Sequence, residues 1–428
     1  MAPHALIIAA LAAALTTAPG PRAPRGVVRV EDHCLADASG PFLGLGASYF
    51  TALWRCRNDR PRLEADLATL SRHGIRYTRI LSMVGMHPTW EGLEIAPVAY
   101  TSRAGRRVDA WPDYWQRLAE LVDLTYDRYG MRTQITIFAD AQMMPGRAER
   151  LEHMRRMLAD VVAGRERKII LLEVANEAWQ NGFPGEQGTA DLREFTRFLA
   201  DRTDVPVATT SNHEADFDAL YRGGAADIAT WHFSRDRRAA DGWQPVIDCW
   251  NLGLRPGCPP VSSNEPVGPG SSVASETDEM RLLMAPAFAF AARLPMYVYH
   301  CEAGVVGRTR FQDSPGLAGL GRIAGLLPRD LPNWERYDSR DAGSPLSAEG
   351  CVRMACCRKG RRIVGVAVGI DAAAFRLVAP EPANLRIVHP GTGKTLRTVH
   401  LGAGEAVTPA EAPAGVIILG EIAPRRRR

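Results

Sequence analysis

The chain has 428 residues, of which 46% are hydrophobic and 23% are charged. This is an ordinary globular composition with enough apolar residues for a large core. The formal net charge of +4 is too small for this length to indicate a nucleic-acid-binding protein.

The N-terminal segment has the pattern of a secretory signal. Ala5–Leu15 is apolar but too short to span a bilayer, and Thr16–Ala18 offers small residues for cleavage. No Lys or Arg precedes the apolar run, and Pro19 follows the best cleavage site, which weakens the pattern. We expect residues 1–25 to be a signal peptide and linker, and the protein to be secreted or periplasmic. No later stretch predicts a membrane helix.

The eight cysteines give a mild indication of an oxidising compartment. The candidate disulfides are Cys249 with Cys258 across a Gly/Pro-rich loop, Cys34 with Cys56, and Cys351 with Cys356 or Cys357. Unpaired buried thiols are an equal alternative. No Cys-His grouping has zinc spacing, so we predict no metal site and no cofactor.

After a short hairpin or cap over Val27–Gly40, buried apolar runs alternate with amphipathic helical patterns. The predicted strands are Pro41–Phe50, Arg76–Gly85, Arg132–Asp140, Lys168–Glu177, Pro206–Asn212, Asp227–Ser234, Pro260–Glu265 and Pro295–Glu302. The predicted helices are Asp59–His73, Trp111–Tyr129, Arg147–Ala163, Thr189–Arg202, Glu214–Tyr221, Ser275–Leu294 and Leu317–Leu327. This alternation predicts an α/β fold, a (β/α)8 TIM barrel over residues 26–328. The competing open doubly wound sheet usually carries a Gly-rich phosphate turn after its first strand, which is not evident here.

After Pro328 the helical period disappears and short, turn-punctuated apolar stretches follow. The predicted strands are Cys351–Cys357, Arg362–Ile370, Ala374–Val378, Leu385–His389, Leu396–Leu401 and Gly415–Ile422. They predict a small antiparallel, sandwich-like β module over residues 329–422, packed on the barrel. Residues 423–428 are a basic tail, which we expect to be solvated.

Two acidic residues stand at the ends of predicted strands. The fourth strand, IILLEVANE, ends in Asn176-Glu177, and the seventh ends in Glu265. The carboxyl ends of barrel strands form the active face, so these carboxylates should face each other across the barrel mouth. Cleavage of a glycosidic bond needs such a pair: an acid for the leaving oxygen and a carboxylate on the other side of the anomeric carbon.

Further polar and aromatic residues fall near the same strand ends. The candidate substrate-binding residues are Arg79, Asp140, Asn176, Trp179, His213 and His232. Trp90, Trp179, Trp231 and Trp243 could stack on sugar rings, although at least two of these four should belong to the core. Glu302, at the end of the eighth strand, is a rival to Glu265. Glu173, inside the fourth strand, is expected to be a structural ion-pair or hydrogen-bond partner.

Together these motifs resemble those of the clan A retaining glycoside hydrolases, the cellulase-like superfamily of barrels. Asn176-Glu177 is similar to the clan's acid/base motif on strand four, and Glu265 matches its nucleophile on strand seven. Arg79 in GIRYTRI and His232 in Trp231–Phe233 are similar to its motifs on strands two and six. Position 234 is Ser where the clan often has Tyr, and no aromatic platform is evident on strand eight, with Tyr299 and His300 standing nearest.

The resemblance implies a retaining double displacement, with Glu177 as acid/base and Glu265 as nucleophile. Arg79 would keep Glu265 ionised, and Asn176 would contact the sugar 2-hydroxyl. The expected partner is an oligo- or polysaccharide, and the sequence sets neither its identity nor the oligomeric state. One alternative is a catalytically inactive carbohydrate-binding barrel. A lyase or aldolase would want a lysine or metal ligands at the strand ends, which are not found there.

Overall fold

The computed structural model describes residues 25–211, 216–232, 241–251, 255–270, 274–409 and 412–424. The predicted signal segment, His213, Ser234 and the basic tail Arg425–Arg428 lie outside these residues. Within them, no helix combines the length and the apolar character that a bilayer crossing requires.

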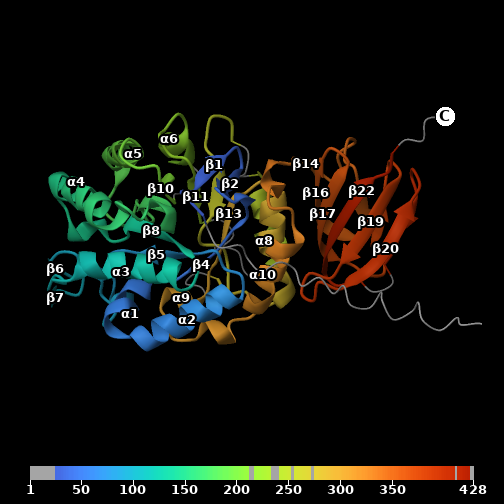
Figure 1. The fold of residues 1–428 in the computed structure, drawn as a ribbon. Coiled ribbons are helices and arrows are strands. Elements are labelled where there is room, and N and C mark those ends of the chain that lie inside the picture. Colours follow the sequence, from blue (N-terminus) through green and yellow to red (C-terminus); the bar gives the residue numbers. More distant parts are fainter. Residues whose placement is uncertain are drawn as a thin grey trace, which may run out of the picture.

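Eight parallel strands form the central sheet (Figure 1). Their bounds are β4 Gly44–Ser48, β5 Tyr77–Leu81, β8 Arg132–Phe138, β9 Ile169–Ala175, β10 Val207–Thr210, β11 Ala229–Trp231, β12 Val261–Ser263 and β13 Met296–Tyr299. The first strand of this sheet in sequence, β4, pairs with the second, β5, on one side and with the last, β13, on the other. At the remaining seam, the N–H groups of Asp227 and Ile228 donate to the carbonyl of Val207 over 2.8 and 3.4 Å. The predicted barrel is therefore confirmed, with strands shorter than the sequence suggested.

Helices surround the strands. Their bounds are α1 Ala52–Asn58, α2 Arg60–Arg72, α3 Tyr114–Asp127, α4 Arg147–Arg156, α5 Gly185–Ala200, α6 Phe217–Tyr221, α7 Gln244–Ile247, α8 Glu279–Ala291, α9 Glu302–Val305 and α10 Leu317–Leu326. In α2, Asp59 caps the first turn by accepting from the Arg62 N–H over 3.3 Å. Leu63, Leu67 and Leu70 then recur at helical spacing and are fully buried.

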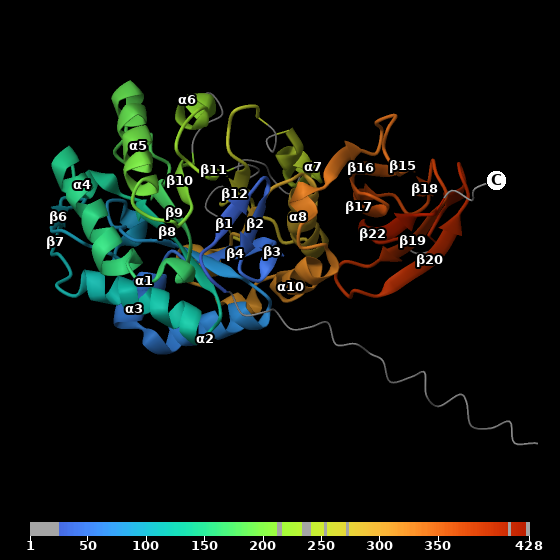
Figure 2. The same cartoon turned by 45° about the horizontal axis from the view of Figure 1, so that its top comes forward.

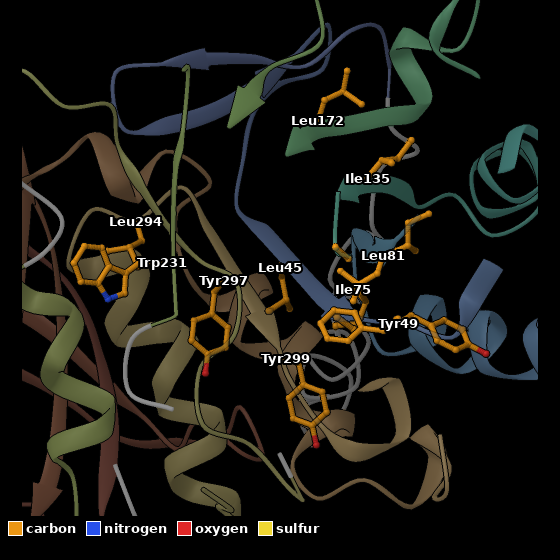
Figure 3. Close-up of a cluster of buried hydrophobic side chains, with 14 of the residues drawn as sticks. Leu45, Tyr49, Ile75, Leu81, Ile135, Leu172, Trp231, Leu294, Tyr297 and Tyr299 are labelled. Carbon is orange, nitrogen blue, oxygen red and sulfur yellow. The ribbon is translucent and has the colours of Figure 1, made fainter. Parts of the chain in front are cut away.

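Apolar side chains pack between the strands and the helices around them. Figure 3 shows part of this layer, including Leu45, Ile135 and Leu172 from three different strands. Trp231 belongs to the same cluster, with its ring 4.9 Å from that of Phe217. Trp231 is therefore a core residue and not a stacking surface for a sugar. At least two of the four candidate tryptophans were expected to belong to the core.

The barrel interior changes character along its axis. At the N-terminal ends of the strands it is apolar, and a small sheet of β1 Arg29–Glu31, β2 Cys34–Asp37 and β3 Gly40–Phe42 supplies Val28 and Leu35 to it. Tyr77 fills this layer so closely that a Cβ on Gly46 would lie 2.3 Å from its ring. Arg79 follows Tyr77 by two residues on β5, so its side chain points to the same face and also lies inside the barrel. Arg79 and its partners thus lie toward the C-terminal ends of the strands, whereas the buried ion pair of Arg132 with Asp37 lies at the start of β8.

The C-terminal module is an antiparallel sandwich, as predicted. Its larger sheet has the order β14-β16-β17-β22-β19-β20, and its smaller sheet β15-β18-β21. The bounds are β14 Glu335–Asp338, β15 Ser347–Glu349, β16 Cys351–Lys359, β17 Arg362–Ile370, β18 Arg376–Val378, β19 Ala383–Val388, β20 Thr395–Leu401, β21 Ala406–Val407 and β22 Gly415–Ile422. Helix α8 lies between barrel and module (Figures 1 and 2). Along β16, Met354 and Cys356 face the sandwich core, whereas Ala355 and Cys357 face the barrel.

The candidate disulfides are wrong, because all eight cysteines are free. Cys34 lies at the N-terminal end of the barrel against the Arg329 carbonyl, whereas Cys56 lies on α1 against the Arg117 carbonyl. Cys351 lies five and six residues before Cys356 and Cys357 on the same extended strand, β16, which places it roughly 16–20 Å from them at about 3.3 Å per residue. The alternative of unpaired, mostly buried thiols is the one that the structure supports.

Candidate active site

Glu177 and Glu265 come together at the mouth of the barrel. Glu177 follows β9 by two residues, and Glu265 follows β12 by two residues. One carboxylate oxygen of each and one ring nitrogen of His232 all lie within 4.8 Å of one another. The Glu177 side chain is 15% exposed and that of Glu265 is 4% exposed. The pair is thus shielded yet open to a small substrate group on the Glu177 side.

Arg79 fixes Glu265 from inside the barrel. Its fully buried guanidinium donates from Nη1 to Oε1 of Glu265 over 2.6 Å. Nη2 donates to Oε2 of Glu173 over 3.0 Å and to Oδ1 of Asn176 over 2.7 Å. Burial by itself lowers the pKa of Arg79, but Glu173 and Glu265 outweigh this and raise its pKa above the ordinary value. Arg79 is therefore a permanent cation between two carboxylates.

Glu173 is the counter-ion at the base of this network, in agreement with its predicted structural role. Its carboxylate also accepts from Thr136 Oγ1 over 2.6 Å, from Gln134 Nε2 over 3.4 Å and from Asn264 Nδ2 over 2.8 Å. The sequence reading missed Gln134, Thr136 and Asn264. A signal was present, since Gln134 and Thr136 are polar residues at alternate positions, on one face of a fully buried strand.

His232 lies directly after β11 and connects the two carboxylates. Its Nδ1 lies 3.1 Å from Oε1 of Glu177, and its Nε2 lies 3.3 Å from Oε1 of Glu265. His232 therefore contacts each carboxylate through a different ring nitrogen, and the three side chains form one compact cluster.

Glu177 is held in an unusual conformation. Its φ is +42°, which a residue with a side chain seldom adopts and which costs on the order of 1–3 kcal/mol. Its N–H donates to Oγ of Ser211 over 3.4 Å, and its Oε2 accepts from Nε2 of Gln180 over 2.5 Å. Gln180 was also missed from sequence, although it stands only three residues after Glu177. The strain is consistent with a side chain fixed for chemistry.

The remaining predicted substrate-binding residues have different environments. Oδ2 of Asp140 accepts from the N–H groups of Gly85 and Met86 over 2.8 and 3.0 Å, which ties β8 to the loop after β5. Burial raises the pKa of Asp140 despite these bonds. Trp179 is half-buried in the loop after Glu177. A sugar contact by Asp140 or Trp179 remains a prediction.

Glu302 is held by its own loop and not by the carboxylate cluster. It accepts from the N–H groups of Arg308 and Thr309 over 2.8 and 2.6 Å, and from Thr309 Oγ1 over 2.7 Å. Partial burial opposes ionisation, but these hydrogen bonds lower its pKa below the ordinary 4.5. The geometry thus favours Glu265 over Glu302 as the partner of Glu177.

Strand β13 supplies no aromatic platform. The Tyr299 hydroxyl donates to the Pro315 carbonyl over 2.6 Å, and Nδ1 of His300 lies 2.8 Å from Oγ of Ser48. Both side chains are 2% exposed. The aromatic platform that the clan often carries on strand eight is therefore not formed by Tyr299 or His300.

Solved structures of glycoside hydrolases share this architecture. One, described as a glycoside hydrolase, superposes with a TM-score of 0.67 at 12% identity, over 93% of this chain and 97% of its own. Another, a glycoside hydrolase family 5 protein from Bacteroides vulgatus ATCC 8482, has a TM-score of 0.67 at 11% identity, over 93% of this chain and 94% of its own. The chain has the fold of the glycoside hydrolase barrels. No protein-family model matches it, and a search of curated proteins also gives no match.

Proposed function

We propose that the protein hydrolyses O-glycosidic bonds of an oligo- or polysaccharide with retention of anomeric configuration. The observation that carries this proposal is the distance of at most 4.8 Å between carboxylate oxygens of Glu177 and Glu265. Retaining enzymes hold their two carboxyl groups about 5–5.5 Å apart, whereas inverting enzymes leave about 6.5–9.5 Å for a water molecule. The shared fold supports the same activity class.

In the first step, a carboxylate oxygen of Glu265 attacks the anomeric carbon. The bond to the leaving oxygen breaks, and that oxygen takes the proton of the Glu177 carboxyl group. The Arg79 cation keeps Glu265 ionised and aims it, because a guanidinium hydrogen bond fixes both charge and direction. The product of this step is a sugar ester of Glu265.

In the second step, the Glu177 carboxylate takes a proton from water as the water oxygen attacks the anomeric carbon and the ester to Glu265 breaks. His232 contacts both carboxylates and would keep the pair aligned through this exchange. Oδ1 of Asn176 faces Arg79, which has only donors, so its amide nitrogen is the group available to a sugar hydroxyl. Export of the protein would bring it to polysaccharides outside the cell.

Two variants and one label test this proposal. Glu177→Gln and Glu265→Gln should each reduce kcat at least about 10³-fold on a glycan that the wild type cleaves, and the partly exposed position of Glu177 should leave the thermal midpoint of Glu177→Gln unchanged. A fluorinated-sugar inactivator should add its mass to the peptide that contains Glu265. Full activity in either variant, or a label on the Glu302 peptide, contradicts the assignment. Glycan binding without cleavage by the wild type would indicate an inactive carbohydrate-binding barrel.

A further inference from the structure

A hollow lies on the insert that follows β5, at the same end of the barrel as the proposed catalytic pair. This insert contains the hairpin β6 Tyr100–Thr101 and β7 Arg107–Val108. The hollow has a volume of about 240 Å³, and Met86, His87, Pro88, Glu91, Ser102 and Arg106 line it. None of these residues takes part in the network around Arg79.

The walls of the hollow combine apolar and hydrogen-bonding groups. Met86 and Pro88 offer apolar surface, whereas Glu91 and Ser102 offer oxygen atoms. Arg106 forms an ion pair with Glu94, so its charge is balanced, and the exposed Glu91 carboxylate disfavours an anionic occupant. A neutral sugar ring matches such walls, because it presents C–H faces and hydroxyl groups together.

A buried polar group lies against Gly85, one of the residues that line the hollow. The Tyr100 hydroxyl has no hydrogen-bond partner among the described residues, and the Tyr100 side chain is 6% exposed. A Cβ on Gly85, which also lines the hollow, would lie 1.8 Å from that hydroxyl. Position 85 therefore admits only glycine, so this part of the wall of the hollow carries no side chain.

The hollow is joined to the catalytic pair through two side chains. The Arg103 N–H bonds to the Met86 carbonyl over 3.2 Å at the rim of the hollow. Its guanidinium donates to the Gln180 carbonyl over 3.4 Å, and Gln180 in turn donates to Glu177. The loop after β5, which forms the hollow, and the loop after β9, which carries Glu177 and Gln180, are therefore in contact at the C-terminal end of the barrel.

We propose that this hollow is a remote subsite that binds one neutral sugar unit of the chain being cleaved. The substrate is accordingly an oligosaccharide of several sugars rather than a disaccharide or a simple glycoside. This inference rests on the proposed function, since it takes the pair Glu177 and Glu265 as the point of cleavage. Binding energy gained in the hollow would help to orient the bond at the pair.

The test measures how kcat/KM depends on the length of the substrate, in the wild type and in a variant whose hollow is filled by a side chain. Ala104 lines the hollow at the exposed hairpin turn, so Ala104→Trp should occupy the space without disturbing the core. Neutral oligosaccharides of two to six sugars, from a polysaccharide that the wild type cleaves, serve as probes. We expect kcat/KM for the longest chain to fall about tenfold in Ala104→Trp, with the shortest cleaved chain unaffected. Glu91→Ala, which only removes an acceptor, should act in the same direction.

Arg107→Trp is the matched control, because it adds the same bulk on the same hairpin at an exposed residue that does not line the hollow. It should leave the dependence on chain length as in the wild type. If Ala104→Trp and Glu91→Ala both retain the full preference for long chains, the subsite is excluded while the catalytic assignment stands. If the wild type cleaves no glycan of any length, the proposed function fails instead.

Discussion

Oε1 of Glu265 lies 2.6 Å from Nη1 of Arg79, and both side chains are almost entirely shielded from water. The same guanidinium binds Glu173 on its other side, so one cation balances two buried carboxylates. Water cannot reach Glu265 to stabilise its charge, so the ionised form of Glu265 depends on Arg79.

Arg79→Met should therefore destabilise the fold and abolish turnover. Removal of one partner from a buried ion pair costs about 3–5 kcal/mol, because the other charges stay buried. Arg79→Lys keeps a charge but cannot donate to Glu173, Asn176 and Glu265 with the same geometry. We expect it to fold while kcat/KM falls at least about 100-fold. Denaturant unfolding and steady-state kinetics measure the two effects, and an Arg79→Met protein of wild-type stability would contradict the ion-pair argument.

Glu302→Gln should separate a structural carboxylate from the proposed catalytic one. The change removes the charge that accepts from Arg308 and Thr309, so at neutral pH it should lower the free energy of unfolding with little loss of kcat. The pKa of Glu302 is lowered on folding, so its stabilising charge is present above about pH 4.5 and is lost as pH falls through the folded pKa. The difference in the free energy of unfolding between wild type and Glu302→Gln should thus become smaller in acid. A loss of kcat like that of Glu265→Gln would identify Glu302 as the nucleophile.

Much of the barrel was predictable because its physical signals are local. A strand buried on both faces reads as an apolar run, and the helix that covers it reads as an amphipathic pattern. Helix α1 was missed, since its sequence, Ala52–Asn58, directly follows an apolar run that was assigned to the first strand. Strand β14 was missed because its four residues, Glu335–Asp338, contain no apolar run.

The candidate site was predictable only as a set of positions. Strand ends gave Arg79, Glu177, His232 and Glu265, because all parallel strands of a barrel end at one face. The contact of His232 with both carboxylates was not predictable, since it depends on the packing of strands whose residues Glu177 and Glu265 lie 55 and 33 positions from His232 in sequence. The left-handed φ of Glu177 likewise has no sequence signal, because glycine would be the residue expected there.

Tyr221→Phe should weaken the seam of the barrel between β10 and β11. The Tyr221 hydroxyl accepts from the N–H groups of Thr210 and Thr230 over 3.0 and 3.1 Å, and donates to the Thr210 carbonyl over 2.5 Å. Phenylalanine keeps the ring but leaves these buried backbone groups without that partner, at a cost of about 1–3 kcal/mol. Denaturant unfolding measures the loss, and hydrogen exchange at Thr230 should speed up. Unchanged exchange there would show that the hydroxyl does not hold the seam.

Arg336→Leu should show that the β module stabilises the barrel. Arg336, on β14, donates to the carbonyls of Trp250 and Ala292 over 2.6 and 3.2 Å, and its guanidinium lies 4.1 Å from the centre of the Trp250 ring. Burial lowers the pKa of Arg336 to about 10.

Trp250 lies in the connection between β11 and β12, which carry His232 and Glu265 at their ends, so this contact links the module to the site. Leucine leaves two carbonyls unpaired, and we expect the free energy of unfolding to fall by about 2–3 kcal/mol in a single transition, with reduced kcat. Arg386→Leu, at an exposed position of β19, is the matched control and should change neither quantity. Two separate unfolding transitions, with the barrel unaffected by Arg336→Leu, would instead make the module an independent appendage.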